Sequence, residues 1–192
     1  VETLRKTAAL ARRYGAPLLI HLAESRDELE QVQGRYGSTP VQYLENIGFL
    51  GPDVLGAHAI WVNAADIATL AERGVGVVHN PESNMKLASG IAPVPDMLAN
   101  HMTVGLGTDG CASNNNLDLF TEMDMAAKLH KINTMDTTVI DALTALRMAT
   151  IEGAKALGMG EMTGSLETGK RADVIIVDTK KPHLTPMYNP YS

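Results

Sequence analysis

Short apolar runs alternate with stretches of helical periodicity over the first part of the chain. The runs span residues 17–21, 53–58, 74–79 and 102–109, and each is too short to form a typical helix. They lack the apolar and polar alternation of a strand that faces water on one side. We therefore expect four buried strands of a parallel sheet.

The segments between these runs carry signals typical of helices. Residues 3–14 place apolar side chains on one face of a helix. Thr39 is suited to cap a helix that runs to Ile47, and Asn63 to cap the next helix, which ends near Gly74. Strands that alternate with helices in this way predict the α/β class, with helices on the faces of a parallel sheet.

The pattern changes beyond the fourth strand. Two long helices are predicted over 117–132 and 136–158, and a β-rich run over 173–178 follows a turn. We expect residues 1–160 to form one domain with the four strands. Residues 161–192 are expected to begin a small β-sandwich-like domain and to end in a proline-rich connector.

A polar side chain stands at the end of each predicted strand: His21, His58, His79 and Asp109. In a (β/α)₈ barrel the active site is formed at this carboxyl edge of the strands. A complete barrel takes about 250 residues, whereas this chain supplies four strand and helix units. We expect the C-terminal half of a (β/α)₈ TIM barrel. The start at Val1, instead of a Met, agrees with a chain that is part of a longer polypeptide.

Each strand-end residue also has an ordinary structural explanation. His21, with Glu24 three residues later, could be a hydrogen-bonded histidine beside a helix-capping acid. Asp109 lies between glycines and could simply form a turn. His58 and His79 could be satisfied histidines at the edge of the core. Their recurrence on successive strands favours a common site.

Other polar residues receive no chemical role at this stage. His101 and His130 are expected on helix surfaces and His183 in the proline-rich tail, while Cys111 is expected to be a small buried residue. The loop 80–95 follows a strand at the active-site edge, where such loops often cover or shape a site.

The amide-rich run 113–120 lies close to Asp109 along the chain, but its composition is explained without a role in the site. It is expected to be a hydrogen-bonded loop in which Asp118 or an asparagine caps the next helix.

Composition removes several function classes. With 16 basic and 22 acidic residues the net charge is −6, so nucleic-acid and membrane-surface binding are not expected. No apolar run approaches the ~18 residues of a membrane span, and no signal peptide precedes the first helix, which favours the cytoplasm. With a single cysteine, a metal site has to use histidine and carboxylate ligands.

The motifs IHLAESRDE, GAHAIW, VVHNPESNMKLASGIAPV and GLGTDGCASNNNLDLFTEM together resemble the amidohydrolase superfamily. Among its members they are most similar to the 5-methylthioadenosine/S-adenosylhomocysteine deaminases. The resemblance runs through essentially the whole chain with the motif order intact. It implies a metal-dependent hydrolase barrel of which this chain supplies about half.

The resemblance also implies roles for individual residues. His21 and Asp109 match two ligands of a single zinc ion, with iron or manganese as alternatives. Glu24 matches a proton carrier, and His58 matches a residue that orients the attacking water and the departing amine. Glu24, His58 and Asp109 are the expected catalytic and substrate-binding residues, whereas His79 has no implied role. The family's other two ligands come from an HxH motif, which this sequence lacks.

The implied activity is hydrolytic deamination of the adenine ring of a purine nucleoside, 5′-methylthioadenosine or S-adenosylhomocysteine. The same machinery could act on another ring, such as guanine, cytosine or a triazine, and an inactive half-barrel is the third reading. The expected partners are the missing N-terminal half of the barrel or another chain, in a homo-oligomer. The chain alone is expected to be inactive.

Overall fold

The structure is a computed structural model that describes residues 1–189. Its centre is a four-stranded, all-parallel sheet in the order β1-β2-β3-β4, as the sequence pattern predicts. The strands are β1 (Leu18–Leu22), β2 (Val54–His58), β3 (Gly76–His79) and β4 (Val104–Leu106). The last strand is shorter than the expected 102–109, because the backbone leaves the sheet after Leu106 and turns at Asp109, where φ is +58°.

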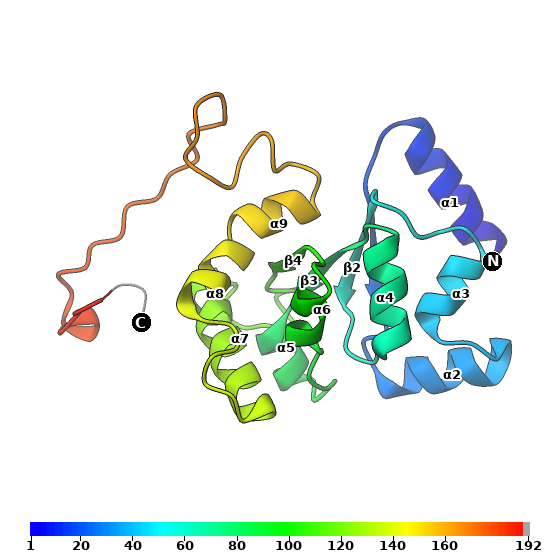
Figure 1. The fold of residues 1–192 in the computed structure, drawn as a ribbon, viewed down its shortest axis with the longest axis horizontal. Helices are drawn as coiled ribbons and strands as arrows, with labels where there is room; N and C mark the ends of the chain where they lie inside the picture. Colours follow the sequence, from blue (N-terminus) through cyan, green and yellow to red (C-terminus); the bar gives the residue numbers. More distant parts are fainter. Residues whose placement is uncertain (190–192) are drawn as a thin grey trace.

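Helices follow or precede each strand and account for nearly half of the remaining described residues (Figure 1). They are α1 (Glu2–Arg13), α2 (Arg26–Tyr36), α3 (Pro40–Asn46), α4 (Ala64–Glu72), α5 (Pro81–Lys86), α6 (Val94–Ala99), α7 (Leu119–Thr134), α8 (Ala142–Met148), α9 (Ile151–Ala156) and the 3₁₀ helix η1 (Pro182–Leu184). Among the described residues, no helix is both long and apolar enough to cross a membrane.

The predicted helix caps are present. The side chain of Thr39 accepts the N–H of Gln42 at 3.1 Å, and that of Asn63 accepts the N–H of Asp66 at 3.0 Å. Asp118 caps α7 in the same manner. Each of these caps satisfies a backbone donor that the first helical turn leaves free.

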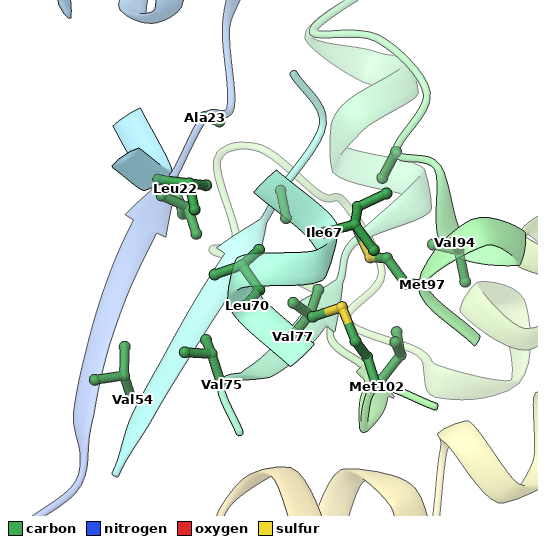
Figure 2. Packing of buried hydrophobic residues seen from close by; sticks show 14 of the residues in the cluster. Leu22, Ala23, Val54, Ile67, Leu70, Val75, Val77, Val94, Met97 and Met102 are labelled. Atoms are coloured by element: carbon green, nitrogen blue, oxygen red, sulfur yellow. The ribbon is translucent and has the colours of Figure 1, made fainter. Parts of the chain in front are cut away.

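The main core lies on the face of the sheet that α4 and α6 cover, and α3 packs against α4 and adds its buried side chains to the same core. Val54 and Val77 on the strands, Leu70 of α4 and Met97 of α6 all belong to this core, and the four side chains are almost completely buried (Figure 2). Burial of each such side chain contributes roughly 1.5–3 kcal/mol to stability. This packing makes the sheet a rigid support for the residues at its edge.

The opposite face is covered over β3 and β4 by α9. Glycines allow this close approach: a Cβ atom at Gly105 would lie 2.8 Å from the Cα of Gly153, and one at Gly76 would lie 3.1 Å from the carbonyl oxygen of Ala156. Toward β1 the same face is open, and Leu19 is 70% exposed. In the described part of the chain β1 and β4 each pair with one strand only, so the sheet has two open edges.

One helical prediction needs correction. The expected helix over 136–158 is two short helices, α8 and α9, because the backbone breaks at Thr150 with φ −127° and ψ −100°. Apolar periodicity continues across the break, so the pattern does not reveal it. No prediction covers the charged segment after β1, which forms the helix α2, capped by Ser25. Its apolar residues Leu29, Val32 and Tyr36 are spaced for one helical face, but none of them is fully buried.

The β-rich run Asp173–Asp178 is extended but forms no strand within residues 1–189. Its apolar side chains face water, and Ile176 is 96% exposed. A strand needs a neighbour to accept and donate its backbone hydrogen bonds. The β-sandwich-like domain over 161–192 stays a prediction, and the end of its connector, residues 190–192, lies outside the described residues.

Candidate active site

Three strand-end residues meet at the carboxyl edge of the sheet. The ligand atoms of His21, His58 and Asp109 all lie within 4.8 Å of one another. The imidazole rings of His21 and His58 are stacked, with centroids 5.4 Å apart. The structure thus confirms that His21 and Asp109 converge at one edge of a parallel sheet.

The backbone is unusual at two of these positions. His58 has φ +71° and Asp109 has φ +58°, in the left-handed region that non-glycine residues seldom adopt. Such conformations persist where the surrounding structure enforces them, and they concentrate at functional sites. Here each turn lies directly beyond a strand and contributes a side chain to the cluster.

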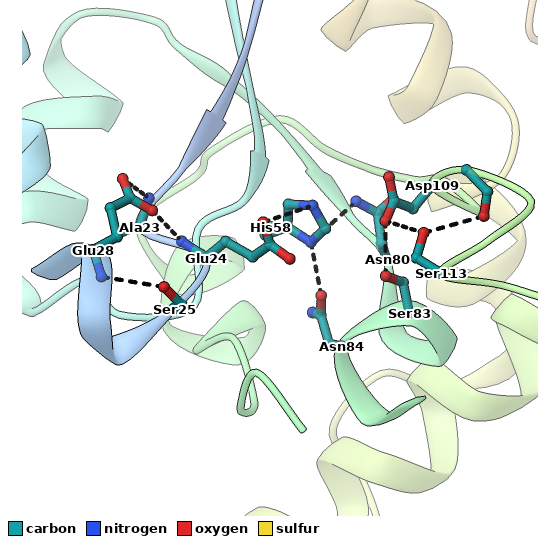
Figure 3. Close-up of polar contacts among 11 residues, drawn as sticks. Ala23, Glu24, Ser25, Glu28, His58, Asn80, Ser83, Asn84, Asp109 and Ser113 are labelled. Atoms are coloured by element: carbon teal, nitrogen blue, oxygen red, sulfur yellow. Dashed lines mark hydrogen bonds and ion pairs between the residues drawn. The ribbon is translucent and has the colours of Figure 1, made fainter. Parts of the chain in front are cut away.

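His58 is completely buried, and its hydrogen bonds define which ring nitrogen carries the proton (Figure 3). Nδ1 lies 2.8 Å from the side-chain oxygen of Asn84, an acceptor, which assigns the proton to Nδ1. The amide nitrogen of Asn80 is 3.5 Å from the same atom, a weaker contact. Nε2 has no hydrogen-bond partner within the described chain and lies 3.9 Å from a carboxylate oxygen of Glu24.

Glu24 is held by its backbone, which leaves its carboxylate free for the site. The carboxylate of Glu28 accepts the N–H groups of Ala23 and Glu24 at 3.0 and 2.9 Å. Ser25 in turn caps α2 by accepting the N–H of Glu28. The side chain of Glu24 is partly exposed and points toward His58 (Figure 3). Glu28 is a supporting residue that the sequence analysis did not identify.

Two serine hydroxyls orient Asp109. Ser83 of α5 and Ser113 of the following loop donate to the same oxygen, Oδ2, at 2.8 and 2.5 Å (Figure 3). Partial burial would raise the pKa of this carboxyl, but these hydrogen bonds and the backbone of Gly110 outweigh it and hold the pKa below its ordinary value. Asp109 is therefore an ionised carboxylate at neutral pH.

These features fit a divalent metal ion. The cluster offers two imidazole nitrogens and one ionised carboxylate, the ligand types that zinc uses in catalytic sites. Nε2 of His58 is buried without a hydrogen-bond partner among the described residues, but so is Nδ1 of both His79 and His130. The convergence of the three side chains is therefore what indicates a metal. Among the described residues no other group of three metal-binding side chains is present.

The loop 80–95 contributes to the site from the side of β3. It begins with α5, and this short helix supplies Ser83 to Asp109 and Asn84 to His58. Both residues are buried. No feature of the sequence distinguishes them from other polar loop residues, because their function depends on side chains that are distant along the chain.

Two predictions about polar residues outside the site are wrong. His130 is fully buried, and its Nε2 lies 3.1 Å from Nε2 of the equally buried His79. Burial lowers the pKa of His130 to about 4, and burial with the neighbouring histidines lowers that of His79. The face of α7 that carries His130 turns inward toward β3. Cys111, expected to be buried, is exposed in the turn after Asp109. His101 and His183 are exposed.

Comparison with known proteins agrees with this geometry. A relative from Syntrophobacter fumaroxidans, named 5-methylthioadenosine/S-adenosylhomocysteine deaminase, is 60% identical over 95% of this chain and 42% of its own length. A 5′-deoxyadenosine deaminase of Methanosarcina mazei is 56% identical over 98% of this chain and 43% of its own length. The chain thus spans less than half the length of these curated relatives.

Solved structures share the fold. An adenosine deaminase from Xanthomonas campestris with bound zinc superposes with a TM-score of 0.94 at 40% identity, over 97% of this chain and 42% of the other. An atrazine chlorohydrolase from Arthrobacter aurescens complexed with zinc superposes with a TM-score of 0.92 at 29% identity, over 99% and 42%. The expected fold class, about half of a metal-dependent hydrolase barrel, is confirmed. The model of the amidohydrolase family matches residues 1–191, and the chain belongs to this family.

Proposed function

We propose that the protein that carries this chain is a metal-dependent aminohydrolase, which removes the amino group from the adenine ring of 5′-methylthioadenosine or S-adenosylhomocysteine. The observation that carries the proposal is the carboxylate of Glu24, 3.9 Å from Nε2 of His58 and beside the cluster of His21, His58 and Asp109. Similarity to deaminases that act on 5′-substituted adenosines supports this choice of substrate.

His21 and Asp109 are the proposed metal ligands in this chain. A bound zinc ion would supply the Lewis acid that lets water attack an aromatic carbon at neutral pH. Iron and manganese are the alternatives. We assign His58 of the three-residue cluster to the attacking water and not to the metal, which leaves two ligands in this chain. A catalytic zinc usually takes three ligands from protein, so we expect further ligands from residues outside this chain.

The residues of the chain account for the proton transfers. Hydrolysis forms a carbon–oxygen bond at the ring and breaks the bond to the amine, which leaves as ammonia. Glu24 takes a proton from the attacking water and delivers it to the ring nitrogen. His58 orients the water and the amine through Nε2, since its Nδ1 is occupied by Asn84. Asp109 accepts the second proton on its way to the amine.

A second substrate class uses the same machinery. A triazine hydrolase variant superposes with a TM-score of 0.92 at 29% identity, so a triazine in place of the adenine ring is the strongest alternative. The identities of 60% and 56% to adenosine-type deaminases favour the nucleoside. Guanine, cytosine and an inactive half-barrel complete the alternatives.

The proposed partner is the remaining half of the barrel, from the same polypeptide or from another chain. The open edges at β1 and β4 and the exposed Leu19 support it, because unpaired strands and apolar surface are stable only when covered. A homo-oligomer and a cytoplasmic location remain predictions.

The test is ammonia release from 5′-methylthioadenosine, S-adenosylhomocysteine, 5′-deoxyadenosine, guanosine and atrazine by the zinc-loaded protein that carries this chain. We expect turnover of the 5′-substituted adenosines and no turnover of atrazine. Turnover of atrazine alone would establish the triazine alternative. Turnover of none of them, with zinc bound, would refute the proposal.

A further inference from the structure

A second carboxylate is buried behind the site, on α7. The side chain of Glu122 is 0% exposed and accepts two hydrogen bonds. The side-chain amide of Asn114 donates to one oxygen at 2.6 Å, and the backbone N–H of Glu82 donates to the other at 3.1 Å. Within residues 1–189 no lysine or arginine pairs with Glu122.

The two segments that Glu122 joins are those that hold Asp109. Glu82 is adjacent to Ser83 in α5, and Asn114 is adjacent to Ser113 in the loop after β4. Both hydroxyls donate to Oδ2 of Asp109 (Figure 3). A single side chain of α7 therefore links, through backbone and amide groups, the two donors that orient a proposed metal ligand.

Glu122 has to accept at both oxygens. The side-chain oxygen of Asn114 is already used, since it accepts the backbone N–H groups of Asn116 and Leu117 at 3.0 and 3.1 Å. The amide nitrogen of Asn114 is therefore the group that faces Glu122. The N–H of Glu82 is a fixed donor. The carboxylate accepts both hydrogen bonds, whereas the side-chain amide of a glutamine has one acceptor oxygen and would place its NH₂ group against the other donor.

An ionised carboxylate at this place is costly for the fold. Burial raises the pKa of Glu122 to about 7, and the nearby carboxylate of Glu82 adds to the shift against the hydrogen bonds. A buried charge without a cation is rare in protein cores.

We propose that Glu122 is a positioning residue for Asp109, which keeps α5 and the loop after β4 in the register that lets both serines bind Oδ2. This inference rests on the proposed function, in which Asp109 is a metal ligand. Glu122 itself touches neither His21, His58 nor Asp109 in any hydrogen bond or ion pair of the described chain.

Glu122→Gln tests this role at pH 8, where the carboxylate is ionised. The substitution keeps the shape but places an NH₂ group against a donor. We expect zinc affinity, measured by competition with a chelator, to fall about tenfold, the lower range for residues that support a metal ligand. We expect kcat to fall by a similar factor with KM nearly unchanged. The absorption spectrum of the cobalt-loaded protein should shift, because it reports the ligand geometry.

The matched control is Asp124→Asn on the same helix. Asp124 is exposed and pairs only with Lys128. The substitution removes the same charge from α7, and we expect zinc affinity, kcat and the cobalt spectrum to stay unchanged. Equal effects of the two substitutions would show that the charge of α7 matters rather than the contacts of Glu122, and would overturn the inference.

A rescue variant separates positioning from stability. The amide nitrogen of Asn114 also lies 3.5 Å from Oε2 of Glu82, so the rescue has to remove that carboxylate as well. In the triple variant with Asn114→Asp, Glu122→Gln and Glu82→Gln, the donor and acceptor between positions 114 and 122 exchange places, and the glutamine at 122 keeps an oxygen for the backbone N–H of residue 82. The variant with Glu82→Gln alone is the reference. We expect zinc affinity and the cobalt spectrum of the triple variant to match those of this reference. A triple variant that folds but binds zinc tenfold more weakly than the reference overturns the inference, and so does failure of both Glu122→Gln and the triple variant to fold, which would place Glu122 in the stability of the core.

The proposed function and this inference can be refuted independently of each other. Zinc affinity and the cobalt spectrum require no substrate. If no adenosine derivative is deaminated but Glu122→Gln weakens zinc binding and Asp124→Asn does not, the inference holds and the proposed function falls. Wild-type zinc affinity and kcat in Glu122→Gln would refute the inference alone.

Discussion

His21 lies near the end of β1 and Asp109 in the turn beyond β4, and these two strands form the opposite edges of the sheet. Even so, the ligand atoms of the two side chains lie within 4.8 Å of each other. Neighbouring strands lie about 4.8 Å apart, so a flat sheet would separate the two edges by about three such spacings. The sheet therefore curves strongly, and the turn at Asp109 directs its side chain back across the carboxyl edge. This curvature is what a barrel requires, and it creates the site.

Glu24→Gln is expected to abolish most of the turnover while the metal stays bound. One general acid and base group contributes about 10²- to 10⁴-fold to rate, and the amide cannot carry a proton between water and ring. Deaminase kinetics and zinc content of the purified protein provide the measurement. As a control, Glu30→Gln alters an exposed carboxylate of α2 that pairs with Arg26. Turnover near that of the wild type in Glu24→Gln would remove Glu24 from the mechanism.

Asn84→Ala should reduce kcat about tenfold and destabilise the fold by about 1–3 kcal/mol, the usual cost of a buried polar group without a partner. The substitution takes away the acceptor that holds the proton on Nδ1 of His58. Steady-state kinetics and chemical denaturation measure the two effects. Asn100→Ala is the control: it removes an exposed asparagine that donates only to the carbonyl oxygen of Asp96 at the end of α6, far from His58 along the chain, and it should leave kcat unchanged and stability nearly so. An unaltered kcat in Asn84→Ala would show that the tautomer of His58 is set by another group.

Buried His130 is expected to make the protein less stable in acid. Its pKa is about 4 in the folded chain against 6.5 in the unfolded chain, so the unfolded state binds more protons between these values. The contribution of His130 to the free energy of unfolding is fully present above pH 6.5. It declines as the pH falls toward 4, by roughly 3 kcal/mol for a pKa shift of this size. Denaturation at several pH values measures it. His130→Gln should flatten this dependence, and an unchanged acid limb would contradict the assignment.

In contrast to His130, buried Glu122 is expected to make the folded protein less stable as the pH rises. Its pKa is about 7 in the folded chain and 4.5 in the unfolded chain, so the folded state holds the extra proton between these values. The contribution to the free energy of unfolding is present below pH 4.5 and falls as the pH rises through 7. The difference in stability between wild type and Glu122→Gln, measured from pH 4.5 to 8, isolates it. If the wild type instead became more stable relative to Glu122→Gln as the pH rises, the pKa of Glu122 could not be raised by folding.

Residues 1–192 expressed alone should associate and show no deaminase activity with added zinc. The open edges of β1 and β4 and the exposed Leu19 favour self-pairing or aggregation. Light scattering after gel filtration gives the mass of the species, and an ammonia assay with methylthioadenosine gives its activity. A monodisperse monomer that deaminates this substrate would refute both the half-barrel and the need for further metal ligands.

The sequence by itself determined the parallel sheet, the helix caps and the strand-end residues. Short apolar runs without polar alternation indicate strands buried on both faces, and this pattern depends only on local composition. The prediction holds for β2, β3 and β4, whereas Leu19 and His21 of β1 are exposed on the open face of the sheet. Caps such as those at Thr39 and Asn63 are equally local, since the side chain binds a backbone group within three residues. That His21 and Asp109 would share one edge also followed, because parallel strands end on the same side of a sheet.

Only the tertiary structure decided which polar side chains face inward. His130 and Glu122 lie on a helix of mixed polarity, and they are buried because α7 packs against α5 and the sheet. Asn84 and Ser83 act on residues that lie 26 positions away along the chain. Pairings over such distances are set by how helices pack on the curved sheet, which is a property of the whole fold and leaves no local pattern in the sequence.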